Sequence, residues 1–577
     1  MQGVGFRPFI YDLAGRLGIS GTVSNTTEGV FIKTGSLSYV ELLDFIKNIR
    51  EKSPDPSVIE NISFKETGHR KYSGFIIENS TETENRFQLI SPDIATCEKC
   101  IEDVFNSDDS RRYLYPFTNC TNCGPRFTII KKMPYDRPYT TMDKFKMCSG
   151  CMTEYRDPSD RRFHAQPNAC KKCGPELLLT DKTGNTVCSR DPIKRAAELL
   201  GEGGIIGIKS LGGFQIACDA ASEKTVKKLR ERKSRPAKPF AIMIGNIEWI
   251  RKHYRLSPEE ASSLKSARAP IVLLRKNSST YPLSCSVSFE NKYEGIMLPY
   301  TPIHHILFKY MPGPLVMTSG NISEEPIASG NNDAKKRLKN ICDYYLMHNR
   351  EIYSRYDDSV IRIFMDKEMV LRRARGYAPY PIKINGHAGS RSVLATGAHE
   401  KNTFTILTRK YAISSQHIGD LDTYQSLEFF EDTLINYKSL FGLDEFDIVA
   451  HDMHPDYRST KIARSSISSN MLFPVQHHMA HISSVIAENN LECPLLGFAW
   501  DGTGYGTDGK IWGSEIFEVS SNLDFIRIGH LIEKALPGSA ATIKKPYRMA
   551  AVYLRQLWKR NNSNESLRDY IYNNMAY

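Results

Sequence analysis

The feature that most constrains this chain is a set of four Cys-x2-Cys pairs between residues 97 and 173. A two-residue gap lets both thiolates of a pair bind one ion, and two pairs complete the tetrahedral sulfur shell that structural zinc prefers. The pattern therefore predicts two structural zinc ions. Which pairs combine stays open, because one site per half and a crossed arrangement use the same ligands. The ligands are Cys97, Cys100, Cys120, Cys123, Cys148, Cys151, Cys170 and Cys173.

Disulfide bonds, the alternative interpretation of these pairs, require an oxidising compartment. The sequence opens on Met-Gln-Gly-Val-Gly without an apolar signal segment, so we expect a cytoplasmic zinc protein. The 577 residues are 41% hydrophobic and 24% charged, which is typical of a soluble protein with several domains. No run approaches the roughly 20 apolar residues of a membrane span, so no membrane partner is expected. The net charge of +11 favours phosphorylated or nucleotide ligands without requiring nucleic acid.

Residues 1–80 alternate between helical and strand patterns and predict a compact α+β unit. A helix is expected over residues 7–17, with strands near residues 21–24 and 30–33. A second helix is expected to bury the face formed by Val40, Leu43, Ile46 and Ile49.

The glycine loop before the first helix ends at Arg7, and its free N–H groups and guanidinium fork suit a phosphate. Gln2-Gly3-Val4-Gly5-Phe6-Arg7, followed by Gly21-Thr-Val-Ser-Asn25-Thr-Thr-Glu-Gly29, resembles acylphosphatase. The resemblance implies that Arg7 clamps the phosphate and that Asn25 positions the attacking water, both as catalytic residues. Acylphosphatase-like domains have a strand before this loop, so we expect the N-terminal domain to be incomplete.

Aromatic and basic residues alternate around the cysteine pairs, for example in Arg111-Arg112-Tyr113 and Arg161-Arg162-Phe163. They predict a small aromatic core with arginines that pair with neighbouring domains, in preference to stacking on nucleic-acid bases. We interpret His164 as an ordinary polar residue and not as a further metal ligand.

The middle of the chain begins with a helix capped by Asp191-Pro192, and a strand over residues 205–209 ends at Lys209. Seven cations against one acid follow between residues 227 and 238, a run that favours polyanion binding. Lys209, Lys233-x-Arg235 and Ser319-Gly-Asn321, in this order, resemble the YrdC family. That resemblance implies that a carbamoyl or threonylcarbamoyl adenylate forms here from ATP, with Mg²⁺ bound to the nucleotide and with Asp357 and Asp358 as further candidate ligands. The residues implied to bind ATP and carbamate are Lys209, Lys233, Arg235, Ser319 and Asn321.

In His477-His478-Met479-Ala480-His481 the first and last histidines lie on one helical face, a spacing that suits a divalent metal ion. Asp501 leads a glycine-rich turn that brings N–H groups toward a phosphate. From Val393 onward the segment resembles an actin-like ATPase domain of the TsaD kind, in which two histidines hold a metal beside a nucleotide. Such domains have two lobes, and we expect residues 390–577 to supply little more than the first.

The order of all four parts resembles the carbamoyltransferase family HypF of [NiFe]-hydrogenase maturation. The implied fold is multidomain α+β: an acylphosphatase-like domain (1–80), a zinc module (90–185), a YrdC-like domain (190–383) and an incomplete TsaD-like domain (390–577). The resemblance implies that carbamoyl phosphate and ATP yield carbamate and then carbamoyl adenylate. The carbamoyl group then passes to the C-terminal cysteine of the protein HypE, for synthesis of the cyanide ligands of the hydrogenase centre.

Two other functions remain open at this point. A threonylcarbamoyl-adenylate or tRNA-modifying enzyme would share the middle and C-terminal motifs, but it has no use for the acyl-phosphate site of Arg7 and Asn25. A zinc-knuckle chaperone would leave Lys209, Asn321 and His477 without a role.

Overall fold

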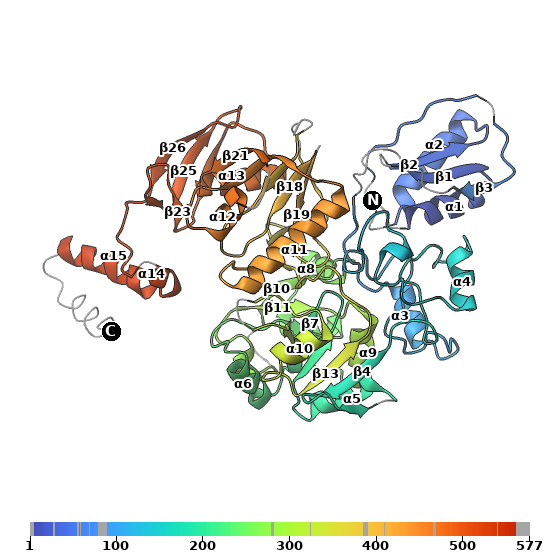
Figure 1. Ribbon diagram of the computed structural model, residues 1–577, viewed down its shortest axis with the longest axis horizontal. Helices are drawn as coiled ribbons and strands as arrows, with labels where there is room; N and C mark the ends of the chain where they lie inside the picture. Colours follow the sequence, from blue (N-terminus) through green and yellow to red (C-terminus); the bar gives the residue numbers. More distant parts are fainter. Residues whose placement is uncertain are drawn as a thin grey trace. The chain divides into compact units, whose positions relative to one another are not determined.

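The computed structural model describes residues 5–560 apart from short internal segments (Figure 1). The residues outside the description are 1–4, 27–28, 55–56, 58, 60, 69, 79–88, 189, 278–281, 323–324, 385–390, 409, 466–468, 539 and 561–577. The chain forms two compact units, Met1–His451 with Tyr457–Phe473, and Asp452–Asp456 with Pro474–Tyr577. Among the described residues, no helix is both long and apolar enough to cross a membrane.

The N-terminal segment of the first unit is a three-stranded sheet, ordered β2-β1-β3, with two helices. Its elements are α1 (Phe6–Arg16), β1 (Gly21–Thr26), β2 (Gly29–Thr34), α2 (Tyr39–Lys52) and β3 (Phe75–Ile77). Helix α1 buries Ile10, Leu13 and Ala14 against this sheet. The order of elements agrees with the expectation from the sequence.

The expected buried face of α2 is only half right, because Ile49 is buried and Ile46 half-buried but the first two residues are exposed. Val40 is 76% and Leu43 is 44% exposed, whereas Phe45 and Ile49 are buried. Each three-residue step falls about 60° short of a full helical rotation, so the series from Val40 to Ile49 drifts around the helix. Phe45 and Ile49, four residues apart, keep to one side.

The zinc-binding segment has little regular structure: α3 (Glu98–Phe105), α4 (Ser149–Arg156) and the 3-10 turn η1 (Arg137–Tyr139). Cys97 and Cys148 are the N-cap residues of α3 and α4. Their partners Cys100 and Cys151 therefore lie in the first turns of these two helices. Tyr115, Phe117 and Phe127 are buried and belong to a core that continues into the middle of the chain.

A twelve-stranded mixed sheet forms the middle of the chain, in the order β15-β14-β10-β11-β8-β12-β7-β6-β13-β4-β5, with β9 paired to β10. Its first two strands precede residue 190, where the sequence placed the start of this domain. The strands are β4 (Leu177–Asp181), β5 (Thr186–Cys188), β6 (Ile206–Lys209), β7 (Phe214–Asp219), β8 (Ile242–Met243), β9 (Tyr254–Arg255), β10 (Ile271–Lys276), β11 (Tyr293–Met297), β12 (Leu315–Ser319), β13 (Tyr344–His348), β14 (Val360–Phe364) and β15 (Lys367–Arg372).

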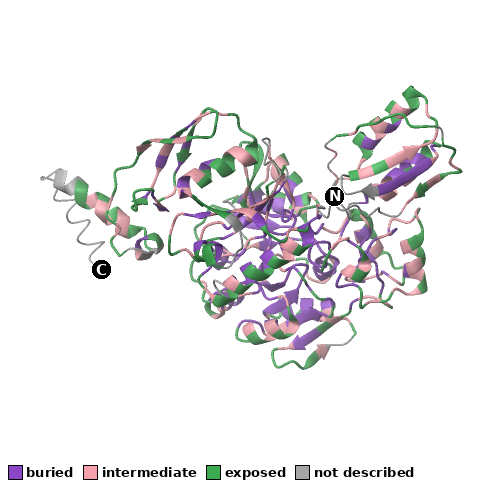
Figure 2. Cartoon of the chain, turned by 45° about the horizontal axis from the view of Figure 1, so that its top comes forward, coloured by how far each residue is buried: buried purple, intermediate pink, exposed green. Residues whose placement is uncertain are grey.

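Helices cover this sheet, and the buried residues gather on its central strands (Figure 2). The expected cap at Asp191 is confirmed, because its side chain accepts a hydrogen bond from the Lys194 N–H and Pro192 opens the helix. The helices are α5 (Pro192–Gly201), α6 (Glu223–Arg232), α7 (Ile247–His253), α8 (Pro258–Lys265), α9 (Pro302–Tyr310) and α10 (Asn331–Arg337), with the 3-10 turn η2 (Cys285–Val287).

A six-stranded sheet, ordered β16-β19-β18-β17-β20-β21, follows the middle segment. Its elements are β16 (Ile382–Lys383), β17 (Val393–Ala395), β18 (Thr405–Thr408), β19 (Tyr411–Ser414), α11 (Tyr424–Phe441), β20 (Phe446–Asp452), α12 (Arg458–Ser465) and β21 (Ser469–Val475).

The second unit contains the histidine helix and two small sheets, β22-β25-β26 and β23-β24. Its elements are α13 (His477–Asn489), β22 (Leu495–Ala499), β23 (Gly504–Tyr505), β24 (Ile511–Trp512), β25 (Glu515–Val519), β26 (Phe525–His530), α14 (Ala540–Lys544) and α15 (Tyr547–Arg560). Ile482 of α13 packs against Trp512 and Phe517 of the sheets.

Candidate functional site

The eight cysteines form two separate clusters, one in each half of the zinc segment. Cys97 and Cys100 join Cys120 and Cys123, and the other four cysteines form the second cluster. Neighbouring Sγ atoms within the clusters lie 3.7 to 3.8 Å apart. Four thiolates at about 2.3 Å from a tetrahedral zinc ion lie about 3.8 Å apart, whereas a disulfide brings two sulfurs to about 2.05 Å. The residues therefore fit one zinc ion per half.

The two halves are repeats of one pattern, about 50 residues apart. Asp103 on α3 corresponds to Glu154 on α4, and Arg111-Arg112 corresponds to Arg161-Arg162. The backbone repeats as well, since Leu114 and His164 hold left-handed φ values of 53° and 51°. The repeated spacing of Cys-x2-Cys and Arg-Arg in the sequence would have revealed this repeat, which the motif reading missed.

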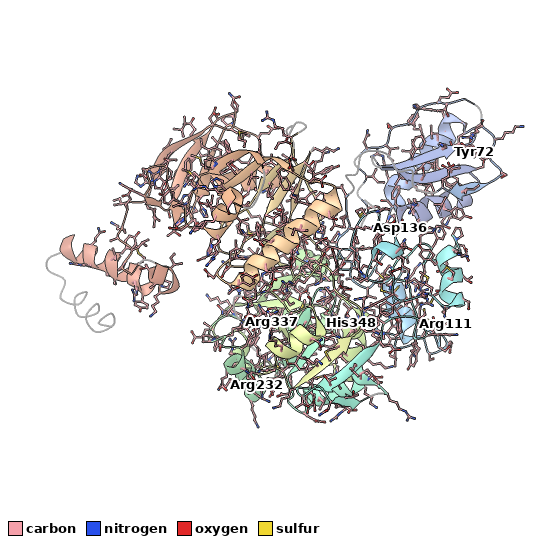
Figure 3. All side chains as sticks on the ribbon, viewed as in Figure 1. Tyr72, Arg111, Asp136, Arg232, Arg337 and His348 are labelled. Carbon is pink, nitrogen blue, oxygen red and sulfur yellow. The ribbon has the colours of Figure 1, made fainter. Side chains whose placement is uncertain are left out.

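Each half of the zinc segment braces the other. Arg111 donates to Glu154 at 2.9 Å and to Cys151 Sγ at 3.0 Å, so it contacts a ligand of the second cluster. Arg161 donates to Cys100 Sγ at 3.0 Å and pairs with Asp103, which places it on the first cluster. Arg111 is labelled in Figure 3. Each arginine therefore supports a thiolate of the cluster in the other half, and not of the cluster in its own half.

The structural interpretation of the aromatic and basic residues is confirmed in part. Tyr115 and Phe117 are buried, and Phe117 meets the His348 ring edge-on at 5.2 Å. The arginines pair across the two halves and not with another domain. His164 stacks on Tyr155 with the centroids 5.0 Å apart and belongs to no metal-binding group among the described residues.

Four of the five predicted ATP ligands meet at one end of the large sheet. Lys233 Nζ donates to the Ser319 carbonyl at 2.6 Å, to the Asn321 carbonyl at 2.7 Å and to Asn321 Oδ1 at 2.9 Å. Ser319 Oγ donates to Asn321 Oδ1 at 2.8 Å. Arg235 reaches Thr318 Oγ1, beside Ser319, at 3.3 Å. A buried ammonium and a guanidinium are therefore concentrated at a strand end.

Lys209 lies at the same end of the sheet, two strands away. Strand β7 separates it from β12, with Phe214 opposite Lys209 and Gln215 opposite Ser319. Neighbouring strands are about 4.8 Å apart, so roughly 10 Å separates the two backbones. Lys209 Nζ donates to the carbonyl of His348, which Figure 3 labels, at 3.2 Å.

Burial lowers the pKa of both lysines. The pKa of Lys233 falls to about 7, because desolvation disfavours the ammonium and nearby Arg235 adds repulsion. Desolvation also lowers the pKa of Lys209 to about 8, and the charge of Arg350 contributes. An anion that enters the site would stabilise the charged form of both lysines, because it replaces the interactions with water that the ammonium groups lose on burial.

Several cations of the basic run, which favours polyanion binding, are engaged by groups of the protein itself. Lys228 and Arg232 pair with Asp343 at 3.1 and 2.8 Å. Arg230 is buried and donates to the Val287 carbonyl at 2.9 Å. Lys233 and Arg235 of this run reach the predicted ATP ligands or their neighbour Thr318, whereas Lys228, Arg230 and Arg232 are held by neighbouring elements.

The two candidate carboxylates, Asp357 and Asp358, are already engaged by arginines. Asp357 pairs with Arg372 at 2.9 Å, and Asp358 pairs with buried Arg375 at 2.7 Å. Asp358 also accepts from Gln215 at 2.6 Å. These contacts differ from the open carboxylate pair that a magnesium ion would need. The sequence did not reveal them, because their partners are 15 to 143 residues away.

His477, His481 and Asp501 form a third group that could hold a metal ion, which we call the metal-binding group, with one ligand atom of each within 4.8 Å of the others. The Nε2 atoms of His477 and His481 lie 2.9 and 3.4 Å from Asp501 Oδ2. The two histidines therefore lie on one side of the helix, as their spacing predicts, and the Asp501 carboxylate faces both of them. The donor set of two imidazoles and one carboxylate fits a divalent transition metal.

Asp452 is a site residue that the motif reading missed. Its Oδ2 lies 2.7 Å from His477 Nδ1, a contact that orients the Nε2 atom toward the metal-binding group. The bonds to Asp452 first, and then to Asp501, raise the pKa of His477 to about 9. Burial opposes ionisation of Asp501, but the bonds from both histidines keep its pKa well below its usual range. A metal ion would replace the proton of His477 here.

Gly504 lets the glycine-rich turn approach the histidine helix. A Cβ at this position would lie 2.6 Å from His478 Cε1 and 2.9 Å from His477 Cβ. His478 itself is buried and contacts Gln476 at 3.2 Å. It therefore points away from the metal-binding group, as its position in the helix predicts.

The N-terminal candidates are only partly described. Arg7 lies in the first turn of α1. Burial lowers the pKa of its guanidinium, and the nearby Asp136 and Tyr155 partly offset this effect. Gly5 caps this helix with a left-handed φ of 74°, and a Cβ there would lie 2.3 Å from Asn122 Oδ1. Gly5 thus lies against the turn between Cys120 and Cys123. Asn25 pairs with Val30 in the β1–β2 ladder, and its side chain lies outside the described residues.

Family comparisons assign each part of the chain. The acylphosphatase family matches residues 1–77, and the HypF finger matches 96–130 and 147–180. The family described as telomere recombination matches residues 198–374. The HypF Kae1-like domain matches 388–488, and a second subdomain of the carbamoyltransferase Kae1-like domain matches 497–574. The chain therefore contains residues of both subdomains, more than the single lobe expected from the sequence.

Full-length relatives share this order of parts. The carbamoyltransferase HypF of Synechocystis sp. is 42% identical over 99% of this chain and 74% of the relative. That of Rhodobacter capsulatus is 39% identical over 96% of this chain and 74% of the relative. A crystal structure of full-length HypF in the phosphate- and nucleotide-bound form superposes with a TM-score of 0.89 at 43% identity, covering 99% of this chain and 75% of that one.

Together these matches define a multidomain α+β carbamoyltransferase with zinc fingers. The chain belongs to the HypF carbamoyltransferase family.

Proposed function

We propose that this protein transfers a carbamoyl group from carbamoyl phosphate, with ATP, to the C-terminal cysteine of HypE during maturation of [NiFe]-hydrogenases. One observation carries the proposal: a single chain of this family joins an arginine loop, a buried lysine site and a His-His-Asp group. We assign them to an acylphosphatase-like domain (1–80), a YrdC-like domain (190–383) and a TsaD-like domain (390–577), with the zinc module (90–185) as scaffold.

In the first step, water attacks carbamoyl phosphate to release phosphate and carbamate. Arg7 holds the phosphoryl oxygens, since its guanidinium offers a planar fork of donors at the helix start. Asn25 orients the water. The proximity of the glycine loop to Asn122 supports release of the carbamate toward the zinc module.

In the second step, a carbamate oxygen attacks the α-phosphorus of ATP, which gives carbamoyl adenylate and pyrophosphate. Lys233, Arg235, Ser319 and Asn321 hold the phosphates and the carbamate, and Lys209 completes the site from β6. The positive charges of Lys209, Lys233 and Arg235 stabilise the negative charge that develops on the phosphoryl oxygens and on the leaving pyrophosphate. Mg²⁺ would accompany ATP and would bind through its phosphates.

In the third step, the acceptor thiolate attacks the carbamoyl carbon, and AMP leaves. His477, His481 and Asp501 would hold a divalent ion, which supplies positive charge for a phosphate or carbonyl oxygen when bound. Asp452 keeps His477 in the orientation that this ion needs. The product is the thiocarbamate of HypE, a precursor of the cyanide ligands.

The decisive experiment measures the cleavage of ATP to AMP and pyrophosphate with and without carbamoyl phosphate. We expect cleavage to depend on carbamoyl phosphate and to be lost in Arg7→Ala, while added carbamate restores it in that variant. Stimulation by threonine, bicarbonate and tRNA in place of carbamoyl phosphate would replace this proposal with the tRNA-modifying alternative.

A further inference from the structure

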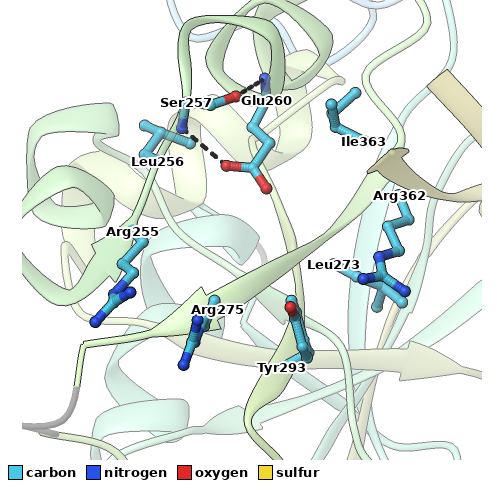
Figure 4. Close-up of a pocket in the computed structure, with 9 residues that line it drawn as sticks. All are labelled: Arg255, Leu256, Ser257, Glu260, Leu273, Arg275, Tyr293, Arg362 and Ile363. Carbon is cyan, nitrogen blue, oxygen red and sulfur yellow. Dashed lines mark hydrogen bonds between the residues drawn. The ribbon is translucent and has the colours of Figure 1, made fainter. Parts of the chain in front are cut away.

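A hollow of about 360 Å³ lies on the outer face of the large sheet, away from the proposed ATP ligands. Figure 4 shows Arg255, Arg275 and Arg362 extending to the same side, with Tyr293 between the last two. The arginines come from β9, β10 and β14, and Tyr293 comes from β11. We call these four residues the arginine face.

The register of the strands places like charges directly opposite each other. Arg255 pairs with Arg275 across β9 and β10, and Tyr293 pairs with Arg275 on its other side. Side chains at paired positions share a face with Cβ atoms about 5 Å apart, and like charges there destabilise a sheet. This arrangement has a cost unless an anion neutralises it.

No acidic side chain of the described residues forms an ion pair with these arginines. Glu294 follows Tyr293 and points to the opposite, buried face, where it accepts from Tyr254 at 2.5 Å. The Glu260 carboxylate lines the hollow but accepts from the Ser257 N–H at 2.8 Å, as the cap of α8. The face therefore carries three guanidiniums against one carboxylate that is already engaged.

The cations form two groups. Arg255 and Arg275 are directly paired across β9 and β10, whereas Arg362 comes from β14, and its guanidinium carbon lies 5.3 Å from the ring centroid of Tyr293. Guanidinium forks match phosphate oxygens in pairs, so two groups of forks suit two linked phosphates better than a single one. The phenol of Tyr293 offers a further donor between them.

We propose that the arginine face is a second anion site, which binds a ligand with linked phosphate groups: pyrophosphate or a nucleoside diphosphate. It lies outside the lysine site, since Lys209, Lys233 and Ser319 do not line the hollow. The proposal goes beyond the proposed function and does not depend on turnover.

Calorimetric titration of the full chain with pyrophosphate, ADP, orthophosphate and citrate tests this site. The Lys233→Ala background removes binding at the proposed ATP site. Arg275→Gln and Arg362→Gln remove one fork from each group. Arg251→Gln is the matched control, because Arg251 lies on nearby α7 and pairs with Glu248 outside the hollow.

In the Lys233→Ala chain we expect pyrophosphate to bind, with Kd rising at least about tenfold in Arg275→Gln and in Arg362→Gln, and unchanged in Arg251→Gln. ADP binding as tightly as pyrophosphate assigns the site to nucleoside diphosphates, and weaker ADP binding assigns it to pyrophosphate. The proposal is overturned by an unchanged Kd in both arginine variants, by loss of all binding in Lys233→Ala, or by citrate binding as tightly as pyrophosphate.

Discussion

The two cysteine clusters and the His477–His481–Asp501 group, which we propose as a metal site, differ in how their ligands are arranged. Each cysteine cluster has four ligands, of which at least two are buried, and an arginine from the other half on one thiolate. The histidine group has three ligands, and His481 is exposed, with 54% of its side chain accessible. A closed shell holds the fold together, whereas an open shell leaves a coordination position for a ligand.

The supporting contacts differ in the same way. The cysteine clusters are braced by guanidiniums, which stabilise thiolates even before a metal binds. The histidine group is supported by the carboxylate of Asp452, which strengthens the imidazole as a ligand and also retains a proton on it. The first arrangement favours permanent occupancy, and the second favours exchange.

The largest expected effect is the loss of a whole zinc ion. Cys100→Ser and Cys151→Ser should each release one of the two ions, because a closed tetrahedral site cannot keep its geometry with three thiolates. The free energy of unfolding should fall by several kcal/mol, since structural zinc binding contributes directly to folding. Metal analysis and thermal unfolding measure both effects.

Cys285→Ser is the control for this prediction, because Cys285 is a free, exposed cysteine outside both clusters. Full zinc retention in both ligand variants would contradict the assignment.

At the histidine group, Asp452→Asn should weaken the binding of a divalent metal about 10- to 100-fold, with little change in stability. The amide cannot hold His477 by charge, so the imidazole loses its fixed orientation. Titration with zinc, after the cysteine clusters are filled, measures the affinity. Glu518→Gln, an exposed carboxylate of β25 in the same unit, should leave it unchanged. An unaltered affinity in Asp452→Asn would show that Asp452 has no supporting role.

Motifs within short stretches could be predicted from the sequence, whereas contacts between residues far apart in the sequence could not. The spacing of the cysteine pairs predicted two clusters, yet their pairing needed the sulfur positions. The His-x3-His spacing predicted a metal pair, but Asp452, 25 residues earlier, is brought to it by the fold. Asp357 and Asp358 look available in the sequence because Arg372 and Arg375 reach them only through the paired strands.

The lysine site adds a pH dependence to the comparison, because burial lowers the pKa of Lys233 itself. The pKa of Lys233 is about 7 in the fold, below an ordinary value near 10.4, so its neutral form is favoured above pH 7. Burying the charged form costs stability below pH 7, and this cost disappears as the pH rises toward 10. Binding of ATP requires the charged form, so the affinity should fall by up to about tenfold per pH unit above pH 7.

Titration of ATP binding between pH 6 and 9 measures this slope, and Lys233→Arg, which stays charged, should flatten it. The same slope in both proteins would assign the dependence to another group.

The smallest effect tests the brace between the two zinc sites. Arg161 belongs to the second half but donates to Cys100 of the first cluster, and Arg111 has the reciprocal contact with Cys151. Arg161→Gln should therefore speed metal release from the first cluster, and Arg111→Gln from the second, each by up to about tenfold. Cadmium NMR resolves the clusters, since each metal gives its own resonance, and a chelator reports the release rates. Arg156→Gln, an exposed arginine at the end of α4, is the matched control. Unchanged metal release from the first cluster in Arg161→Gln and from the second cluster in Arg111→Gln would contradict the prediction. The two zinc sites would then be independent of each other.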